Sequence, residues 1–314
     1  MKKAKIVVIG GGTGLSVLLR GLKKFPVDIT AIVTVADDGG SSGRLRKELN
    51  IPPPGDIRNV LAALSEVEPL VEELFQHRFE NGEGLSGHSL GNLLLAGMTS
   101  ITGDFAQGVQ EISRVLNVKG KVLPASHDHI TLHAEYMDGS FAEGESNIPK
   151  PGKTIKQVFL KPDNPKAMPE AVHAIEDADL IVLGPGSLYT SVIPNLLVFG
   201  MKEALMKATA MKVYICNVMT QPGETDGYTV SDHVHAIDEH VGEKIVDAVL
   251  LNTQPIPFSY AERYKKDGAI GVAIDEEELK DMDVLLIGDD LLYFDDELLR
   301  HNPVKLSQRL VSLL

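Results

Sequence analysis

Short runs of β-favouring residues recur along the chain, and each ends in a glycine-rich or polar loop. The first run, Ile6–Ile9, stops at GGGTG (Gly10–Gly14), after which leucines recur at helical spacing. A second run, Ile29–Val35, is almost continuously apolar, as strands are when helices cover both faces of a parallel sheet. The opening segment therefore predicts a βαβ unit, which is the building block of Rossmann-like α/β folds.

The rest of the chain continues this pattern with two interruptions. Between Asp56 and Asn117 the apolar residues follow helical spacing, which predicts several helices. From 121 to 162 the period changes to two, which predicts a small β-rich insertion. Strand-like runs then return at Leu180–Leu183, Lys212–Cys216, Ala248–Leu251 and Val284–Ile287, and a closing helix is expected from Pro303 to Leu314. We therefore expect one α/β domain over residues 1–314, with a mostly parallel sheet, helices on both faces and this insertion within it.

The charge of the chain limits its partners. Its formal net charge of −14 would repel the phosphate backbone of a nucleic acid, which binds to clustered Lys and Arg. A single nucleotide is compatible with this charge, because backbone N–H groups at a helix start hold a phosphate locally. We therefore expect no nucleic-acid partner, and the charge leaves small phosphate-bearing ligands open.

The chain also carries few marks of secretion or membrane insertion. Its one cysteine, Cys216, cannot form an internal disulfide and lies in a predicted buried strand. The apolar run after the basic start is too short for a signal peptide, and no run approaches the roughly 20 apolar residues of a membrane span. We expect a cytoplasmic protein, and we also expect it to self-associate.

The first glycine-rich loop, GGGTG, lies between a predicted strand and a predicted helix. Glycines there let the backbone approach a phosphate closely, and the helix start offers unpaired N–H groups. The loop lacks the last glycine of the dinucleotide fingerprint, because position 15 is leucine, and it lacks the Lys-Ser or Lys-Thr of a P-loop. A tight turn without a ligand is the alternative.

The second loop, ADDGGSSGRLR (36–46), follows the second predicted strand. Asp37 lies about where dinucleotide-binding folds place the acid that binds ribose. Ser41 and Ser42 offer hydroxyl and N–H groups to a phosphate, with Arg44 or Arg46 adding charge. In the alternative, Asp37 or Asp38 caps a helix and the glycines form a surface turn.

A third polar cluster begins a strongly apolar helix at GHSLGNLLLAG (87–97). It contains His88, Ser89 and Asn92, and its two glycines suggest close approach by a ligand, although Ser89 could simply cap the helix. Upstream, PPPGDIRN (52–59) predicts a rigid turn that leaves Asn59 in the first turn of another helix.

Two more loops follow later strands, where open α/β sheets bind ligands. In GPGSLYTS (184–191), Ser187 and Thr190 offer hydrogen-bond donors, and Tyr189 offers a ring for stacking on a base. In CNVMTQPGETDGYT (216–229), we expect Asn217, Thr220 and Glu224 to face the same crevice.

Three histidines at positions 127, 129 and 133 are predicted to share one face of an alternating strand. Such spacing is compatible with a metal site, but Thr131 and Glu135 share the face and no cysteine joins them. A polar strand face is the preferred interpretation, and we expect no metal there.

Taken in order, these loops resemble the YvcK-like gluconeogenesis factors, a bacterial family related to the CofD-like 2-phospho-lactate transferases. The resemblance covers nearly the whole chain and rests on GGGTG, DDGGSSGRLR, PPPGDIRN, GHSLGN, GPGSLYTSVIPNLLV and TQPGETDGY. It implies a Rossmann-like core with a cleft, binding of UDP-glucose or UDP-N-acetylglucosamine, and a role in maintaining cell shape during gluconeogenic growth. It also implies a regulator that works with a protein partner in cell-wall or carbon regulation.

The resemblance also implies which residues contact the ligand. The phosphate contacts carried over by motif are Gly12, Thr13, Gly14, Ser41 and Ser42. The remaining contacts of the ligand are Asp37, Asn59, His88, Asn92, Gly186, Ser187, Tyr189, Asn217 and Thr220.

Two enzymatic alternatives remain beside the regulatory binder. The related transferases use acidic residues and a divalent metal, so Asp37, Asp38 and Glu224 are the catalytic candidates here, with Mg²⁺ needed only in that case. An oxidoreductase would instead hold NAD at the opening βαβ unit, where Asp37 favours it and the incomplete glycine fingerprint disfavours it. Fold resemblance does not distinguish these functions.

Overall fold

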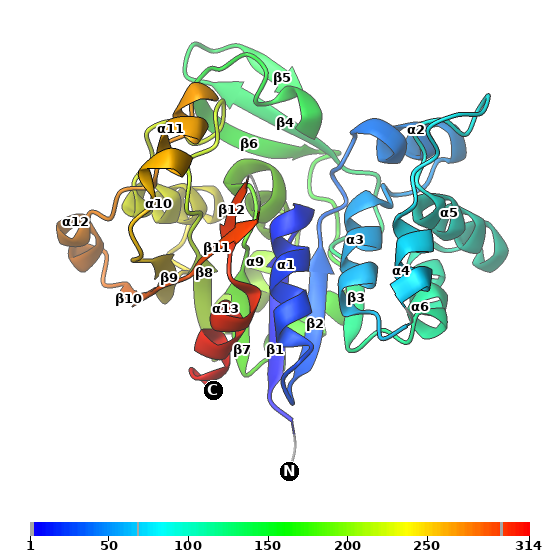
Figure 1. Ribbon diagram of the computed structural model, residues 1–314, viewed down its shortest axis with the longest axis horizontal. Helices are drawn as coiled ribbons and strands as arrows, with labels where there is room; N and C mark the ends of the chain where they lie inside the picture. The colour runs from blue at the N-terminus through cyan, green and yellow to red at the C-terminus, as the bar shows by residue number, and fades with distance from the viewer. Residues whose placement is uncertain (1–2, 68, 296–297) are drawn as a thin grey trace.

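The computed structural model describes residues 3–67, 69–295 and 298–314, and a seven-stranded parallel sheet lies at its centre (Figure 1). The strand order is β10-β9-β8-β7-β1-β2-β3. The strands are β1 (Lys5–Gly10), β2 (Asp28–Val33), β3 (Lys121–Pro124), β7 (Leu180–Leu183), β8 (Met211–Ile215), β9 (Ala248–Asn252) and β10 (Leu285–Asp289). The predicted α/β class and the predicted strands are confirmed.

Both faces of this sheet are buried, which explains why its strands are apolar throughout. In β1, Val7 and Ile9 belong to one hydrophobic cluster and Ile6 and Val8 to the other, because side chains alternate between the faces of a strand. Side chains of four helices pack in the first cluster: α7 (Pro169–Glu176), α8 (Ile193–Leu196), α9 (Met201–Lys207) and α10 (Val230–Val241). On the other face, the second cluster contains side chains of α1 (Gly12–Leu22), α3 (Gly55–Leu64) and α13 (Pro303–Val311).

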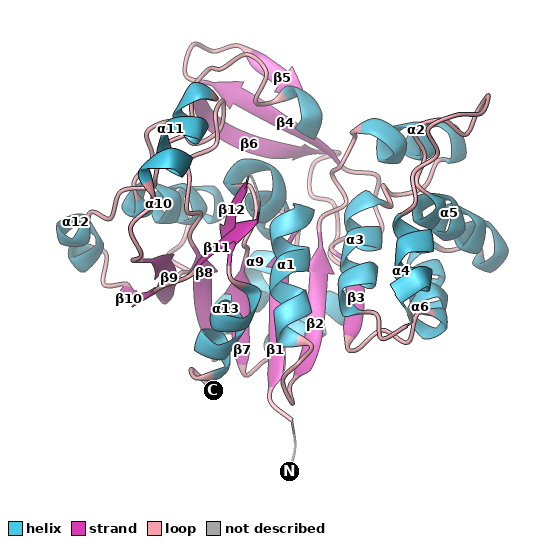
Figure 2. Cartoon of the chain, in the orientation of Figure 1, coloured by secondary structure: helices cyan, strands magenta, loops and turns pink. Residues whose placement is uncertain are grey.

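The remaining helices lie toward the two ends of the sheet (Figure 2). Beyond β3 lie α2 (Gly40–Leu49), α4 (Pro69–Gln76), α5 (Leu90–Thr102) and α6 (Phe105–Val115). Helices α3 to α6 confirm the helical stretch predicted between Asp56 and Asn117, whereas α2 occupies most of the segment 36–46 that was expected to be a loop. Toward β10 lie α11 (Phe258–Lys266) and α12 (Glu276–Asp281). No helix among the described residues is long and apolar enough to cross a membrane.

A small antiparallel sheet covers the carboxyl ends of the central strands. It contains β4 (Thr131–Tyr136), β5 (Phe141–Glu143) and β6 (Ile155–Lys161), followed along the chain by α7 of the core. The predicted insertion therefore begins later than position 121, because β3 pairs with β2 in the central sheet. A separate hairpin, β11 (Leu292–Asp295) with β12 (Leu298–His301), precedes α13.

The strand order places a topological switch point between β1 and β7. From β1 the chain first proceeds to β2 and β3 on one side, and it later returns to β7 on the other side. The chain therefore continues from β1 and from β7 toward opposite sides of the sheet. Open α/β sheets form ligand clefts at the carboxyl ends of two such strands.

The closing helix is held against α1 at a glycine, and this contact is testable. A Cβ atom at Gly21 would overlap the carbonyl oxygen of Pro303 and the hydroxyl of Ser307. We expect Gly21→Ala to lower the free energy of unfolding by about 3 kcal/mol, as overpacking against backbone does. Urea denaturation measures the change.

The matched control is Gly97→Ala in α5, where an added Cβ meets nothing within 4 Å. This variant should gain up to about 1 kcal/mol from the higher helix propensity of alanine. Equal effects at the two glycines would contradict the role assigned to Gly21.

Candidate functional site

A cleft of about 330 Å³ opens at the switch point between β1 and β7. It is lined by the start of α1, the loops after β7 and β8, strand β12 and Tyr264 of α11. Apart from Tyr264, its polar and glycine residues are Gly12, Thr13, Gly14, Gly186, Ser187, Ser191, Asn217, Gln221, Arg300 and His301. Six of the residues predicted from sequence are therefore brought together in this cleft.

The two glycine-rich loops pack directly against each other at the base of the cleft. An added Cβ at Gly14 would lie 2.9 Å from the carbonyl oxygen of Pro185, and one at Gly186 would lie 3.1 Å from that of Gly11. These distances are shorter than ordinary contacts of a Cβ atom. Glycine at both positions thus allows the loops after β1 and β7 to meet.

Helix α1 begins inside the cleft, at Gly12. The first N–H groups of a helix have no partner within the helix and carry partial positive charge. The N–H of Gly12 donates to Oδ2 of Asp56 at 2.9 Å, while Thr13 and Gly14 line the cleft beside it. The start of α1 is therefore suited to an anionic group such as a phosphate.

A chain of side-chain hydrogen bonds crosses the opposite wall. Nε2 of Gln221 donates to Oγ of Ser187 at 2.7 Å, and Nδ2 of Asn217 donates to Oε1 of Gln221 at 3.4 Å. Gln221 was missed by the sequence analysis, although it lies within the TQPGETDGY motif. This network fixes the orientation of Ser187 and Asn217 before any ligand arrives.

Strand β12 adds two residues that no sequence motif indicated, Arg300 and His301. Nε of Arg300 and Nε2 of His301 are buried and have no hydrogen-bond partner. Burial lowers the pKa of His301 to about 4, so its ring is neutral at pH 7. Both residues lie in the β11–β12 hairpin, which carries no local motif, so only the folded chain brings them to the cleft.

The polar group around α2 lies apart from the lining of this cleft. Oγ of Ser41 lies 2.9 Å from Nδ1 of His88 and accepts a hydrogen bond from Nδ2 of Asn92 at 3.0 Å. All three side chains are buried, as is Ser42. They join α2 to the start of α5, where Ser89 caps the helix as the alternative interpretation predicted.

Asn59 also lies outside the cleft lining. Its side-chain oxygen accepts a hydrogen bond from the guanidinium of the buried Arg58 at 2.7 Å. Two predicted contacts after β7 and β8 are engaged in the interior as well. The hydroxyl of the buried Tyr189 lies 2.6 Å from that of Tyr228, and Oγ1 of Thr220 accepts from the N–H of Ile270 at 3.0 Å. These contacts leave Tyr189 without an open ring face in the cleft.

Acidic side chains surround the inner side of the glycine turn. Burial raises the pKa of Asp56 to about 6 and that of Glu224 to about 7. Burial, followed by the carboxylates of Asp56 and Asp37, raises the pKa of Glu145 well above its ordinary value. One oxygen of Glu145 is buried without a partner. The carboxyl groups therefore share a region in which full ionisation is unfavourable.

Asp37 and Asp38, which follow β2, also have structural contacts. Oδ1 of Asp37 accepts from the N–H of Gly39 at 2.8 Å, and Oδ1 of Asp38 accepts from the N–H of Ser146 at 2.9 Å. Asp37 does not line the cleft, in contrast to the ribose-binding acid of a dinucleotide fold. The contact of Asp38 instead joins the loop after β2 to the segment that follows β5.

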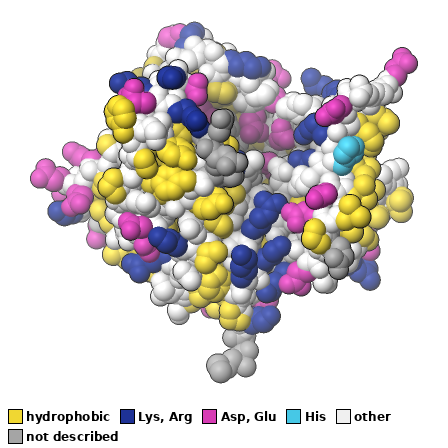
Figure 3. All heavy atoms as spheres, viewed as in Figure 1, with side chains coloured by type: hydrophobic (Ala, Val, Ile, Leu, Met, Phe, Trp, Pro, Cys, Tyr) yellow, Lys and Arg dark blue, Asp and Glu magenta, His cyan; other side chains and the backbone are white. Residues whose placement is uncertain are grey.

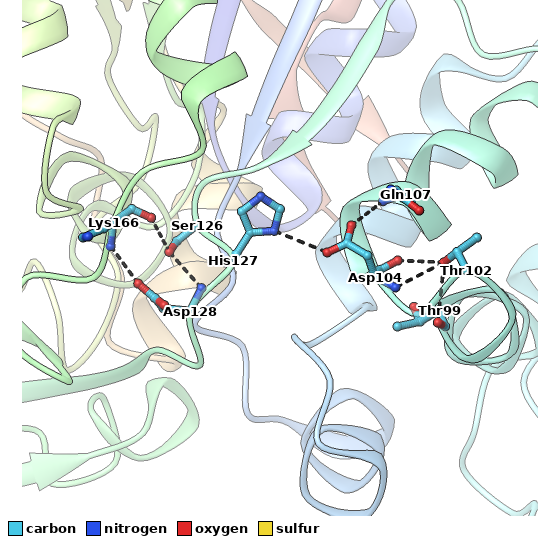
Figure 4. A network of polar contacts seen from close by, with 8 residues as sticks. All are labelled: Thr99, Thr102, Asp104, Gln107, Ser126, His127, Asp128 and Lys166. Atoms are coloured by element: carbon cyan, nitrogen blue, oxygen red, sulfur yellow. Dashed lines mark hydrogen bonds and ion pairs between the residues drawn. The ribbon is translucent and has the colours of Figure 1, made fainter.

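The acidic residues do not form a preformed metal centre. Within the described ranges, no three His, Cys, Asp or Glu side chains are grouped so that they could hold a metal ion. The expected arrangement of the histidines is wrong, because β4 begins at Thr131 and His127 and His129 precede it. His127 instead contacts Asp104 at 3.8 Å (Figure 4), and His133 stacks on Phe159.

The raised pKa of Glu224 makes stability depend on pH. The folded protein keeps this proton up to about pH 7, whereas the unfolded chain loses it near 4.5. The folded state thus binds more protons between these values, and its stability falls as pH rises through them. Glu224→Gln should raise the free energy of unfolding by about 3 kcal/mol at pH 8 and by about 1 kcal/mol at pH 5. Urea denaturation at both pH values tests this.

The control is Glu243→Gln, which removes an exposed carboxylate from the turn after α10. It should change stability by less than about 0.5 kcal/mol at either pH. An equal gain from Glu224→Gln at pH 5 and pH 8 would mean that Glu224 is ionised in the folded protein at both.

Comparison with known proteins identifies the family. Residues 6–292 match the family described as 2-phospho-L-lactate transferase CofD. A gluconeogenesis factor of Halalkalibacterium halodurans is 65% identical over 312 residues, covering 99% of this chain and 97% of that protein. The gluconeogenesis factor of Bacillus subtilis is 59% identical over 313 residues, covering 100% and 99%. A crystal structure of a Bacillus halodurans protein, 65% identical, has a TM-score of 0.97 and covers 99% of this chain and 100% of that one. The chain belongs to the CofD family, together with relatives named gluconeogenesis factors.

Proposed function

We propose that this protein is a regulatory gluconeogenesis factor that binds a UDP-sugar, of the UDP-glucose or UDP-N-acetylglucosamine type, in the cleft at the switch point. Its role is to maintain normal cell shape during gluconeogenic growth, in the cytoplasm. The names of the relatives support the gluconeogenic role.

The charge of the cleft carries the proposal. The formal net charge of the chain is −14, yet no Asp or Glu occurs among the described residues that line the cleft, and Arg300 does. A diphosphate is therefore repelled less in this cleft than elsewhere on the surface. The start of α1 adds N–H groups and partial positive charge on the same side.

The other lining residues match the uncharged parts of a nucleotide sugar. The neutral ring of His301 offers a buried acceptor to a hydroxyl or imide N–H, and Asn217 and Ser187 offer both donors and acceptors. Tyr264 lines the cleft and provides the aromatic ring for stacking on a base that Tyr189 does not. In this proposal Ser41 and Asn92 do not touch the ligand, and their hydrogen bond instead holds α2 against the start of α5.

The binding test is calorimetric titration with UDP-N-acetylglucosamine, UDP-glucose, GTP and NAD, followed by analysis of the mixture for new products. We expect saturable binding of a UDP-sugar that is recovered intact. Asn217→Asp preserves shape but adds a carboxylate beside the diphosphate, so affinity should fall at least about tenfold.

Asn164→Asp is the control, since it makes the same chemical change at an exposed position outside the cleft. Its affinity should match that of the original protein. Equal affinities for Asn217→Asp and Asn164→Asp would place the ligand elsewhere, and selective binding of NAD or GTP would contradict the UDP-sugar.

A phosphoester transferase is the second candidate, because Asp56 of the acidic group bonds directly to the glycine turn. The described carboxylates do not form a metal site as they stand, so we derive no metal-dependent step. Product formation that requires Mg²⁺ and is lost in Asp37→Asn would establish this activity, whereas intact ligand under all conditions would exclude it. The oxidoreductase alternative has less support, because Asp37 lies outside the cleft lining.

A further inference from the structure

A second hollow lies beside the cleft, at the carboxyl ends of β8 and β9. Its volume is about 320 Å³, and it is formed by the residues that follow these two strands, by Val230 at the start of α10, and by Val272 and Ile274 between α11 and α12. Strands β8 and β9 are neighbours in the central sheet, on the side of β7 that leads away from β1 (Figure 1). Open α/β sheets bind ligands at this edge, so the hollow has the position of a ligand site.

The hollow adjoins the cleft at Asn217 and Val218, which line both spaces. The segment of α11 also contributes to both, because Ile256, two residues before the helix, lines the hollow, and Tyr264 within the helix lines the cleft. Figure 3 shows hydrophobic side chains gathered over α11 and the β11–β12 hairpin, left of centre. The two spaces therefore share part of their wall, and a ligand in the cleft has the hollow within reach past Asn217.

The lining of the hollow is uncharged. Among the described residues that form it there is no Lys, Arg, His, Asp or Glu and no aromatic ring. Side-chain amides come from Asn217, Asn252 and Gln254, and a hydroxyl comes from Thr253. Each amide offers both a hydrogen-bond donor and an acceptor. Such a lining suits a neutral group that carries several hydroxyls, and it suits neither a phosphate nor a base that stacks on a ring.

We propose that this hollow holds the sugar of the UDP-sugar, while the diphosphate lies at the start of α1 and the base lies against Tyr264. The assignment rests on the proposed function, since it places the third part of the same ligand. The cleft provides Arg300 and the partial positive charge of a helix start for the diphosphate, and an aromatic ring for the base. The sugar is the remaining part, and it needs neither a positive charge nor a stacking ring.

The volumes of the two spaces agree with this division of the ligand. Small-molecule sites usually measure about 300 to 1,000 Å³. The cleft, at about 330 Å³, lies at the lower end of this range, and the hollow about doubles the space. A ligand that contains a base, a ribose, a diphosphate and a sugar needs more room than the cleft alone provides.

Hydrogen bonds of Asn252 fix the loop that presents Gln254 to the hollow. Nδ2 of Asn252 donates to the carbonyl oxygen of Gln254 at 2.7 Å, and Oδ1 of Asn252 accepts from the N–H of Leu291 at 3.1 Å. The backbone at Gln254 is thereby tied to the end of β9 and to the residue before β11. A side chain that projects from a fixed backbone loses less entropy when it binds a ligand, so Gln254 is the best placed of the amides to bind a sugar hydroxyl.

Calorimetric titration with UDP and with UDP-N-acetylglucosamine tests the assignment, because the two probes differ by the sugar. Gln254→Leu removes the amide and keeps the approximate size of the side chain, and Val272→Phe fills part of the hollow. Each variant should bind UDP-N-acetylglucosamine at least about tenfold more weakly than the original protein does and should bind UDP with unchanged affinity. Gln107→Leu, at an exposed position in α6, is the control and should change neither affinity. Circular dichroism confirms that each variant is folded.

A failure of the sugar assignment is distinguishable from a failure of the proposed function. If the original protein binds neither probe, the proposed function is wrong and the assignment falls with it. If the original protein binds UDP-N-acetylglucosamine and the Gln254 and Val272 variants bind it equally tightly, the proposed function stands and the sugar lies elsewhere. If both variants lose affinity for UDP as much as for the UDP-sugar, the base occupies the hollow, which also overturns the assignment.

Thiol protection tests the location of the sugar without relying on affinity. Ile274 lines the hollow and is 40% exposed, whereas the native Cys216 is buried. In Ile274→Cys, saturating UDP-N-acetylglucosamine should slow the reaction with a soluble thiol reagent at least about fivefold, and saturating UDP should not slow it. Ile101→Cys, at a position 79% exposed in α5, should react at one rate with either ligand. Equal rates for Ile274→Cys with the two saturating ligands would exclude the sugar from the hollow.

Discussion

The backbone contact between the loops after β1 and β7 determines the geometry of the whole site. Gly14 approaches the carbonyl of Pro185 and Gly186 approaches that of Gly11, so a side chain at either position would push the two loops apart. This contact fixes the start of α1 in the cleft, and α1 in turn holds α13 through Gly21. Packing between the two loops therefore requires these glycines, whether or not a ligand is bound.

The buried acidic residues near this contact lower the stability of the folded protein when they are ionised. Asp56, Glu145 and Glu224 have raised pKa values because they are desolvated, and carboxylates near Glu145 raise its pKa further. A fold selected for stability alone would place apolar or amide side chains there. Strained electrostatics of this kind concentrate at functional sites. The N–H of Gly12 connects the group to the cleft through Asp56, so a change of charge in one place is felt in the other.

The sequence predicted the fold in most of its parts, because strand and helix periodicity are local properties. The strands of the central sheet other than β3, the helical stretch from α3 to α6 and the closing helix follow directly from apolar spacing. Position 121 was misplaced because a four-residue edge strand looks the same whether it joins the central sheet or an insertion. The histidines were misplaced for a similar reason, since alternation continued into a loop before Thr131.

The site was only partly predictable, because a motif shows which loops matter but not which way side chains point. Gly12, Ser187 and Asn217 reach the cleft, whereas Tyr189 and Thr220 turn inward to bond with Tyr228 and with the N–H of Ile270. Arg300 and His301 come from a hairpin about 290 residues after the glycine turn, which no local pattern could connect to it.

The distribution of charge links the cleft to the rest of the surface. A chain with a net charge of −14 would ordinarily present acidic side chains at any opening of this size, yet the described lining of the cleft contains none. Acidic residues are instead gathered behind the glycine turn, where burial and hydrogen bonds restrain them, or spread over the remaining exterior. Excess negative charge on the exterior disfavours the approach of other anions, whereas the described lining of the cleft adds no carboxylate and contributes the guanidinium of Arg300.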